Sequence, residues 1–312
     1  MNDAIVAGAL AFLAAALRMA TPLALAGMGE SISERAGIMN IGLEAIMLGG
    51  AFSAFIAANL THSLALGIAA GVGGGLAVSL VHAWLSVDCR ADQTISGLAL
   101  NSLVSGFTSY LFLIRFGSTT NIPKCPVVPA VDLPLLSGVP VLGPLLAGQS
   151  AFVYLAVLAA LATSLVFRRT EWGINLAAAG ENPRAADSAG LDVRRIRYAA
   201  AAANGILAGL GGAYITIGSL GFFTENVTSG KGYIALVAVI LGRRSPAGVY
   251  GAALLLGAAD ALQFRAQTMG IGIPSQVFIM FPYVATVLVL LFSFGRARDP
   301  AALGRPFERG RR

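Results

Sequence analysis

The sequence has 312 residues, of which 56% are hydrophobic and 12% are charged, with a mean hydropathy of +0.77. Soluble globular domains carry about 25% charged residues, so this composition excludes an ordinary soluble protein. The net charge of +6 does not indicate a nucleic-acid partner, because basic cytoplasmic loops beside anionic lipid headgroups account for it. We therefore expect a membrane protein with lipid, and no nucleic acid, among its partners.

Apolar segments long enough to cross a hydrocarbon layer of ~30 Å recur along the whole chain. They predict an all-α fold, a polytopic transmembrane helical bundle of about 8–10 spans. The first segment continues too far for a signal peptide and is expected to be a retained span. The segment 231–242 is too short to cross alone unless neighbouring helices cover its ends. The candidate spans are 4–26, 39–59, 64–85, 94–114, 150–167, 198–217, 231–242, 248–266 and 274–293.

Lysine and arginine are unevenly distributed between the segments that join the spans. If the C-terminus is cytoplasmic, alternating the spans places most of the 21 basic residues inside, as the positive-inside rule requires. The expected organisation is a transmembrane domain 1–295 with a cytoplasmic loop 168–197, followed by a basic cytoplasmic tail 296–312. The Pro- and Gly-rich segment 115–149 is expected to be an external loop, either a connector or a contact for a partner.

The stretch "GESISERAGIMNIGLEAIMLGGAF" places charges between two apolar runs. Glu30, Glu34 and Arg35 are expected to be solvated charges in a turn, where Ser and Glu suit helix capping. Asn40 and Glu44 are four residues apart and would share one face of a helix. A carboxylate in a span is costly against lipid, so Glu44 must face the interior. There it either ties two helices together or lines a polar route.

Other polar residues in the spans allow similar alternatives. Asn101 lies about two turns into its span and is suited either to helix–helix hydrogen bonding or to lining a pathway. Asp260 precedes Arg265 by five residues, which is a poor spacing for one helical face, and we expect a structural contact for it. Glycines at four-residue spacing predict close helix packing within the bundle, with a homodimer seam as the alternative; they are Gly67, Gly71 and Gly75, and Gly205 and Gly209.

Motifs for catalysis and for cofactor binding are missing from the sequence. The chain has neither a G-x-x-x-x-G-K-[ST] phosphate loop nor a G-x-S-x-G nucleophile elbow. His62 and His82 have no further ligand at metal-binding spacing. Cys89 and Cys125 fall on opposite sides of the predicted membrane and indicate no disulfide. The sequence therefore predicts a non-catalytic chain with no metal and no cofactor.

The cytoplasmic loop contains a short helix that begins at Pro183, since proline suits the first turn, and ends near Gly190, since glycine suits a left-handed cap. Its small side chains would form a smooth surface for docking in a groove of another protein, with a plain amphipathic surface helix as the alternative. The residues of this surface are Ala185, Ala186 and Ala189, flanked by Arg184 and Asp187.

Four stretches together resemble one family: the polar stretch quoted above, "ADQTISGLALN", "GENPRAADSAGLDVRRIRY" and "VAVILGRRSPAGVYGAALLLGAADALQ". The chain is similar to permease subunits of bacterial ABC importers in the branched-chain amino-acid and simple-sugar superfamily, in its nucleoside branch. In such permeases an E-A-A-x-x-x-G pattern forms the coupling helix that contacts the ATPase. Here the pattern reads "RAADSAG", with Arg184 in the place of the glutamate and with Ala185, Ala186 and Gly190 matching. The resemblance also implies that the span begun by Asn40 and Glu44 borders the translocation pathway, and Asn101 is the third pathway candidate from its position in a span.

The resemblance implies a function and a set of partners. The chain would give a nucleoside of the purine type, or a related neutral solute, a path across the bacterial inner membrane by alternating access. Its partners would be an ATP-binding ABC subunit, a second and longer permease subunit or a second copy of itself, and an extracytoplasmic solute-binding lipoprotein. One alternative is a simple-sugar permease of the pentose type. A rival from another class is a secondary transporter driven by protons through Glu44 and Asp260.

Overall fold

The computed structural model describes residues 2–117, 122–131, 142–268, 277–278, 280–293 and 299–308. Most of these residues are helical, as predicted. The short strands β1 (Ala130–Val131) and β2 (Gln149–Ser150) pair antiparallel, with Ala130 opposite Ser150. The helices are α1 (Asn2–Arg35), α2 (Leu43–Thr61), α3 (Leu64–Ala83) with its π-helical continuation η1 (Trp84–Asp88), α4 (Gln93–Phe116), α6 (Leu142–Leu146), α7 (Ala151–Arg169), α8 (Glu171–Glu181), α9 (Pro183–Ser188), α10 (Val193–Ala213) with its π-helical continuation η2 (Tyr214–Leu220), α11 (Lys231–Leu241), α12 (Pro246–Thr268) and α14 (Phe281–Ser293).

Seven helices of the described residues are long and apolar enough to cross a membrane, which defines a multi-pass membrane protein. They are Val6–Arg35, Leu43–Thr61, Leu64–Asp88, Gln93–Phe116, Ala151–Arg169, Val193–Leu220 and Pro246–Thr268. Helix α11 has only 11 residues, which confirms that its segment is too short to cross alone. The predicted span 274–293 lies partly outside the described residues, and α14 forms its second half.

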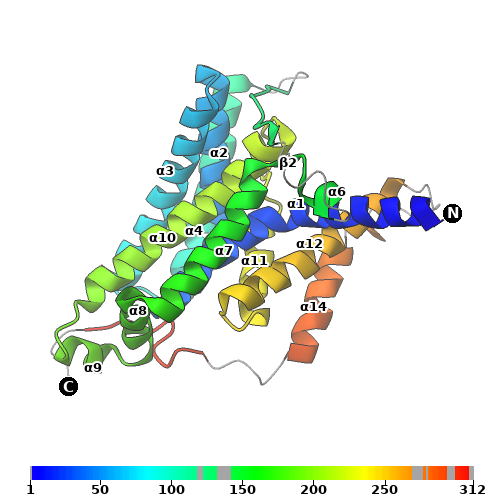
Figure 1. The fold of residues 1–312 in the computed structure, drawn as a ribbon. Coiled ribbons are helices and arrows are strands. Elements are labelled where there is room, and N and C mark those ends of the chain that lie inside the picture. Colours follow the sequence, from blue (N-terminus) through cyan, green and yellow to red (C-terminus); the bar gives the residue numbers. More distant parts are fainter. Residues whose placement is uncertain are drawn as a thin grey trace.

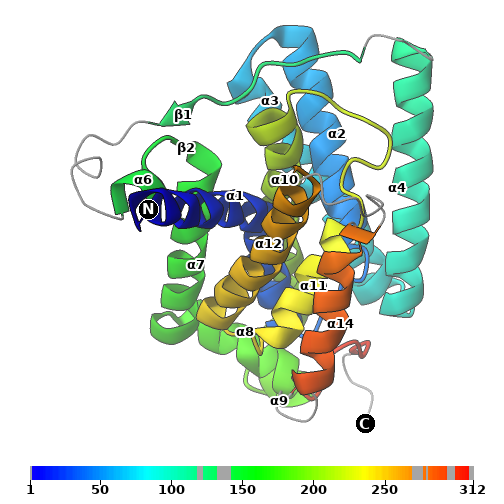
Figure 2. The ribbon, with the colours of Figure 1, turned by 90° about the vertical axis from the view of Figure 1, so that its right-hand side faces the viewer.

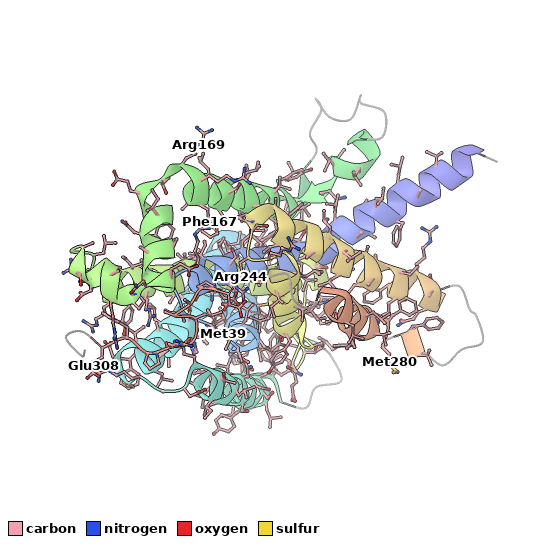
Figure 3. The ribbon with its side chains drawn as sticks, turned by 90° about the horizontal axis from the view of Figure 1, so that it is seen from below. Met39, Phe167, Arg169, Arg244, Met280 and Glu308 are labelled. Carbon is pink, nitrogen blue, oxygen red and sulfur yellow. The ribbon has the colours of Figure 1, made fainter. Side chains whose placement is uncertain are left out.

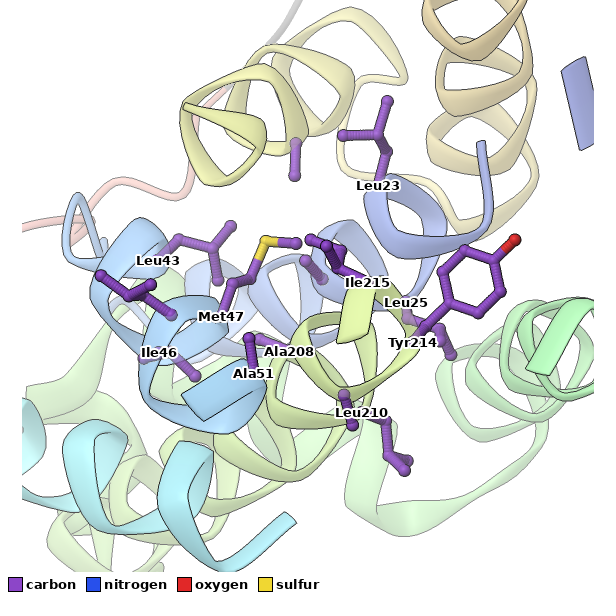
Figure 4. Close-up of a cluster of buried hydrophobic side chains, with 14 of the residues drawn as sticks. Leu23, Leu25, Leu43, Ile46, Met47, Ala51, Ala208, Leu210, Tyr214 and Ile215 are labelled. Atoms are coloured by element: carbon purple, nitrogen blue, oxygen red, sulfur yellow. The ribbon is translucent and has the colours of Figure 1, made fainter. Parts of the chain in front are cut away.

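The C-terminal half of α1 lies at the centre of the bundle, and α1 packs against α10 and α12 (Figures 1 and 2). Most residues of α2 and α10 are buried, whereas most residues of α3 and α4 are exposed or half-buried. Figure 4 shows the core between these elements, where Met47 of α2, Leu23 of α1 and Ile215 of η2 meet. The outward-facing apolar side chains of α4 suit a lipid environment rather than water.

Glycines allow the closest helix contacts in this core. A Cβ added to Gly75 would lie 2.5 Å from both the carbonyl oxygen of Gly205 and the Cα of Gly209. At Gly71, a Cβ would lie 2.8 Å from the Cβ of Ala213. The predicted packing role of these glycines is therefore confirmed: Gly71 and Gly75 join α3 to α10, and Gly67 packs against α2.

Part of the predicted external loop packs on the end of η2. The Cys125 N–H donates to the Gly221 carbonyl at 2.8 Å, and the Val128 N–H donates to the Ile217 carbonyl at 2.8 Å. Residues 118–121 and 132–141 of this loop lie outside the described residues. The described part of this loop, residues 122–131, is thus hydrogen-bonded to η2 and to the residue that follows it.

Candidate functional site: a polar cavity beside α11

Glu44, the second residue of α2, holds the N-terminal end of α11. Its Oε1 accepts hydrogen bonds from the Thr228 hydroxyl at 2.5 Å and from the Gly230 N–H at 2.8 Å, and its Oε2 accepts from the Gly232 N–H at 2.6 Å. The first N–H groups of a helix lack intrahelical partners and carry partial positive charge, so a carboxylate is stabilised there. Glu44 is 6% exposed, and it ties α2 to α11.

Asn101 of α4 performs a similar capping role at the start of α2. Its Oδ1 accepts from the Ala45 N–H at 2.8 Å, while its Nδ2 donates to the Ile41 carbonyl at 3.0 Å and to the Tyr233 hydroxyl at 2.7 Å. The amide therefore uses both its acceptor and its donors. It connects α4 to α2 and to α11.

Glu44 and Asn101 line the same cavity of about 430 Å³, beside α11. This volume falls within the range of about 300–1,000 Å³ typical of small-molecule sites. The lining offers amide, hydroxyl and phenol groups but no lysine or arginine among the residues described. Its residues are Glu44, Ala45, Leu48, Asn101, Ser102, Ser105, Asn226, Ser229, Gly230, Tyr233 and Tyr283. Because the Glu44 oxygens already accept hydrogen bonds, the cavity suits a neutral, hydrogen-bonding solute.

A second cavity of about 380 Å³ is lined in part by the segment that leads into α11. It contains an ion pair between the Lys231 Nζ and the Asp260 Oδ2 at 2.8 Å. The Tyr283 hydroxyl donates to the Ser229 carbonyl at 3.0 Å, and both residues line both cavities. The expected structural contact of Asp260 is thereby confirmed, with Lys231 as its partner.

The predicted helical face shared by Asn40 and Glu44 is wrong. Gly37 has a φ of +87°, a conformation that glycine adopts readily, and α2 begins only at Leu43. Asn40 therefore lies in the irregular segment between α1 and α2, where its N–H donates to the Glu30 Oε1 at 2.8 Å. It is buried and does not line the cavity.

The prediction of a solvated turn at Glu30, Glu34 and Arg35 is also wrong. All three lie in the last turns of α1, and Glu30 and Glu34 are buried. Glu30 accepts from the Asn204 Nδ2 at 2.6 Å. Glu34 forms an ion pair with Arg244, which lies near the centre of the view in Figure 3.

Glu30 and Glu34 can be buried because each has a partner on a distant element, Asn204 for Glu30 and Arg244 for Glu34. Helix α1 therefore continues past the apolar segment. Asn204 and Arg244 are buried or half-buried partners that the predicted site residues do not include. Asn204 carried a signal, because it is the one amide in the apolar run "AAAAANGILAG".

Helix α9 begins at Pro183, as predicted, and the Asn182 side chain caps it by accepting from the Ala185 N–H at 3.0 Å. Gly190 follows with a φ of +88°, which confirms the left-handed cap. Ala186 does not belong to the exposed surface, because it is buried against Ala179 and Val193 of the same chain. The residues exposed on and after α9 are Arg184, Ala185, Ser188, Ala189 and Gly190, with Asp187 half-buried.

The structure offers no ligand set for a metal within the described part of the chain, where no three His, Cys, Asp or Glu residues cluster. His82 is buried and contacts the Met39 carbonyl at 3.3 Å and the Ser96 hydroxyl at 3.3 Å. These neighbours satisfy its ring nitrogens, so His82 joins α3, α4 and the segment after α1.

A multi-pass helical bundle with a polar cavity beside a short helix is typical of membrane transport components. Residues 12–291 match the family described as branched-chain amino acid transport system / permease component. The chain belongs to this family, in which the permease is the non-catalytic membrane subunit and ATP hydrolysis resides in a separate subunit.

Curated relatives cover nearly the whole chain. The guanosine ABC transporter permease protein NupQ of Bacillus subtilis is 36% identical over 96% of this chain and 96% of its own. The nucleoside ABC transporter permease protein NupC of Lactococcus lactis is 36% identical over 91% and 92%. The putative glucose ABC transporter permease protein TsgC13 of Haloferax volcanii is 31% identical over 95% and 97%.

A solved structure supports the fold independently. It is described as an inward-facing conformation of a putative metal-chelate type ABC transporter, and it matches 90% of this chain and 85% of its own with a TM-score of 0.53. Its sequence identity is 19%, so the likeness concerns the helical fold alone.

Proposed function

We propose that the chain is the permease subunit of an ATP-driven importer of nucleosides, of the purine type. The observation that carries the proposal is the cavity that Glu44, Asn101 and Tyr233 line. Its amide and hydroxyl groups match the hydrogen-bonding groups of a nucleoside, and its tyrosines can contact a flat base. The guanosine and nucleoside permeases among the relatives favour the same solute class.

The coupling to ATP is assigned to α9 and its following turn. Pro183, Arg184, Ala185, Asp187 and Gly190 would form the contact with the ATP-binding subunit, while the buried Ala186 would hold α9 to its own chain. Nucleotide binding would favour one arrangement of the ATP-binding subunits, and α9 would transmit that preference to the spans.

Asn40 supports the pathway from outside the cavity in this proposal. Its N–H binds Glu30, which in turn binds Asn204 of α10, so the start of α2 is fixed to the bundle. Glu44 then remains in place at the cavity. Of the three predicted pathway residues, Glu44 and Asn101 thus line the cavity, and Asn40 positions helix α2.

The remaining assignments follow from the distribution of charge. Arg90, Arg194 and Arg244 form ion pairs around the ends of the helices near α8 and α9, which supports a cytoplasmic position for these ends and for the C-terminus. The membrane would be the bacterial inner membrane. A longer permease subunit, two ATP-binding domains and an extracytoplasmic solute-binding lipoprotein would complete the importer.

The test is reconstitution of the complex in vesicles, with uptake measured for guanosine, ribose and glucose. We expect ATP-dependent uptake of guanosine, unaffected by excess ribose, and no ATP hydrolysis by the isolated chain. Uptake of a sugar but not of guanosine would favour the sugar permease, for which the TsgC13 relative is the specific observation. Uptake driven by a proton gradient without ATP would instead support the secondary transporter.

A further inference from the structure

The C-terminal segment, residues 299–308, packs across the ends of several helices instead of extending into solvent. The Ala302 N–H donates to the Gly180 carbonyl at 2.9 Å, and the Gly304 N–H donates to the Gly37 carbonyl at 3.2 Å. Ala302 is buried, and Phe307 packs on the cluster that contains Ala186. Figure 1 shows this segment, in red, close to α8 and α9. The segment therefore forms a fixed wall beside α9.

Two largely buried arginines anchor this wall. The Arg197 Nη1 donates to the Arg305 carbonyl at 3.1 Å, and its Nε donates to the Ala36 carbonyl at 3.3 Å. Arg244 lies between Glu34 and Asp299, with its Nη1 2.6 Å from the Asp299 Oδ1. A buried guanidinium group that loses its partners is costly in free energy. If the C-terminal segment moved away, Arg197 and Arg244 would each lose a partner, so these contacts hold the segment in place.

A groove of about 830 Å³ lies between α9 and the C-terminal segment. Arg90 and Glu308, both on its rim, pair with each other at 2.7 Å, and Glu181 accepts from the Ala301 N–H at 3.3 Å. Arg184 on α9 and Arg305 on the C-terminal segment are exposed and form no ion pair within the described residues. The groove is lined by Arg90, Glu181, Asn182, Pro183, Arg184, Ala301, Ala302, Arg305, Pro306, Phe307 and Glu308.

We propose that this groove seats an acidic segment of the ATP-binding subunit, and that Arg305 recognises its carboxylates together with Arg184. The inference rests on the proposed function, in which α9 contacts that subunit. The groove continues directly from α9, and the guanidinium groups of Arg184 and Arg305, which have no ion-pair partner among the described residues, match carboxylates, which arginine binds with two parallel hydrogen bonds. The docking surface is therefore made jointly by α9 and the C-terminal segment.

The experiment measures the affinity of the purified permease complex for its ATP-binding subunit in detergent. Arg305→Glu should weaken binding about tenfold and Arg305→Ala about threefold, the size expected for exposed charges at an interface. Native binding should also weaken as KCl rises from about 50 mM to about 300 mM, because salt screens such pairs. The Arg305→Glu variant should lose most of this salt dependence.

Arg169→Glu is the matched control, since Arg169 is exposed at the end of α7 and does not line the groove (Figure 3). If Arg169→Glu weakened binding as much as Arg305→Glu, the effect would come from the change in net charge alone, and the inference would be overturned. Unchanged binding in both Arg305 variants, while Ala185→Glu weakens it, would also overturn the inference and leave the role of α9 intact. If the native chain bound no ATP-binding subunit at all, the proposed function would fail as well. Should Arg305→Glu aggregate, Arg305→Ala decides the question.

Discussion

The two ends of α11 are each held by a glutamate from another helix, but in different surroundings. At its N-terminal end, Glu44 accepts hydrogen bonds from backbone N–H groups and faces a cavity of about 430 Å³. Beyond its C-terminal end, Glu34 pairs with Arg244, which also contacts Asp299 of the C-terminal segment. Glu34 is 2% exposed, and it lines none of the three cavities described above.

The difference indicates that the two ends have different tasks. Hydrogen bonds between a carboxylate and helix N–H groups can be replaced by water or by a polar solute when they face a cavity. A buried ion pair has no such substitute, and breaking it leaves an uncompensated charge. We therefore interpret the Glu34 end as the fixed anchor of α11 and the Glu44 end as the part that responds to a solute.

The largest effect is expected from Glu34→Gln, which removes the buried partner of Arg244. The free energy of unfolding should fall by about 3 kcal/mol, the lower end of the range for breaking a buried pair, because Asp299 still contacts Arg244. Thermal unfolding of the purified protein in detergent measures the change. Asp299→Asn is the control and should cost less than about 1 kcal/mol, since its carboxylate is mostly exposed. Equal stability of Glu34→Gln and the native protein would refute the anchor.

Gly232→Ala should have the next largest effect, at the other end of α11. Its new Cβ would lie 2.5 Å from the Glu44 Cα, so α2 and α11 must separate, at a cost of about 1–3 kcal/mol. We expect uptake to fall strongly in reconstituted vesicles. Gly251→Ala on α12 is the control, because a Cβ there meets nothing within 4 Å. A normal uptake rate in Gly232→Ala would show that this close approach is not needed for transport.

Glu44→Gln tests whether the cavity end tolerates the loss of charge. The amide retains one acceptor oxygen but turns an NH₂ group towards N–H donors, so we expect a loss of about 1–2 kcal/mol. The complex should still assemble and retain part of its uptake, with an unchanged pH profile. Uptake between pH 5.5 and pH 8 checks this expectation. A complete loss of uptake in an assembled complex, with a shifted pH optimum, would favour proton coupling through Glu44.

Tyr233→Phe should have the smallest effect on stability. It removes the hydroxyl that accepts from the Asn101 Nδ2 at 2.7 Å, and the net loss should be about 1 kcal/mol or less. If the cavity binds the solute, the KM for uptake should rise while the maximal rate changes little. An unchanged KM in this variant would place the solute elsewhere.

The residues that line the candidate site could be predicted in part from the sequence, but their hydrogen-bond partners could not. Glu44 and Asn101 were predicted to face the interior because polar groups in a span avoid lipid, and both line the cavity. The hydrogen-bond partners of Glu44 cannot be found by helical spacing, since Thr228 lies 184 residues away. Asn40 was misplaced because the pattern does not show that Gly37 interrupts the helix before Leu43.

The sequence by itself determined the membrane class, most of the spans and the absence of catalytic motifs, because hydropathy and residue type act locally along the chain. Only the tertiary structure decided which polar groups are buried and with whom. Glu30 meets Asn204 across 174 residues, and Glu34 meets Arg244 across 210. A charge beside an apolar run has the same local pattern whether it lies in water or against a distant guanidinium group. The packing of α1, α10 and the segment after α11 selects the buried state by supplying the partner.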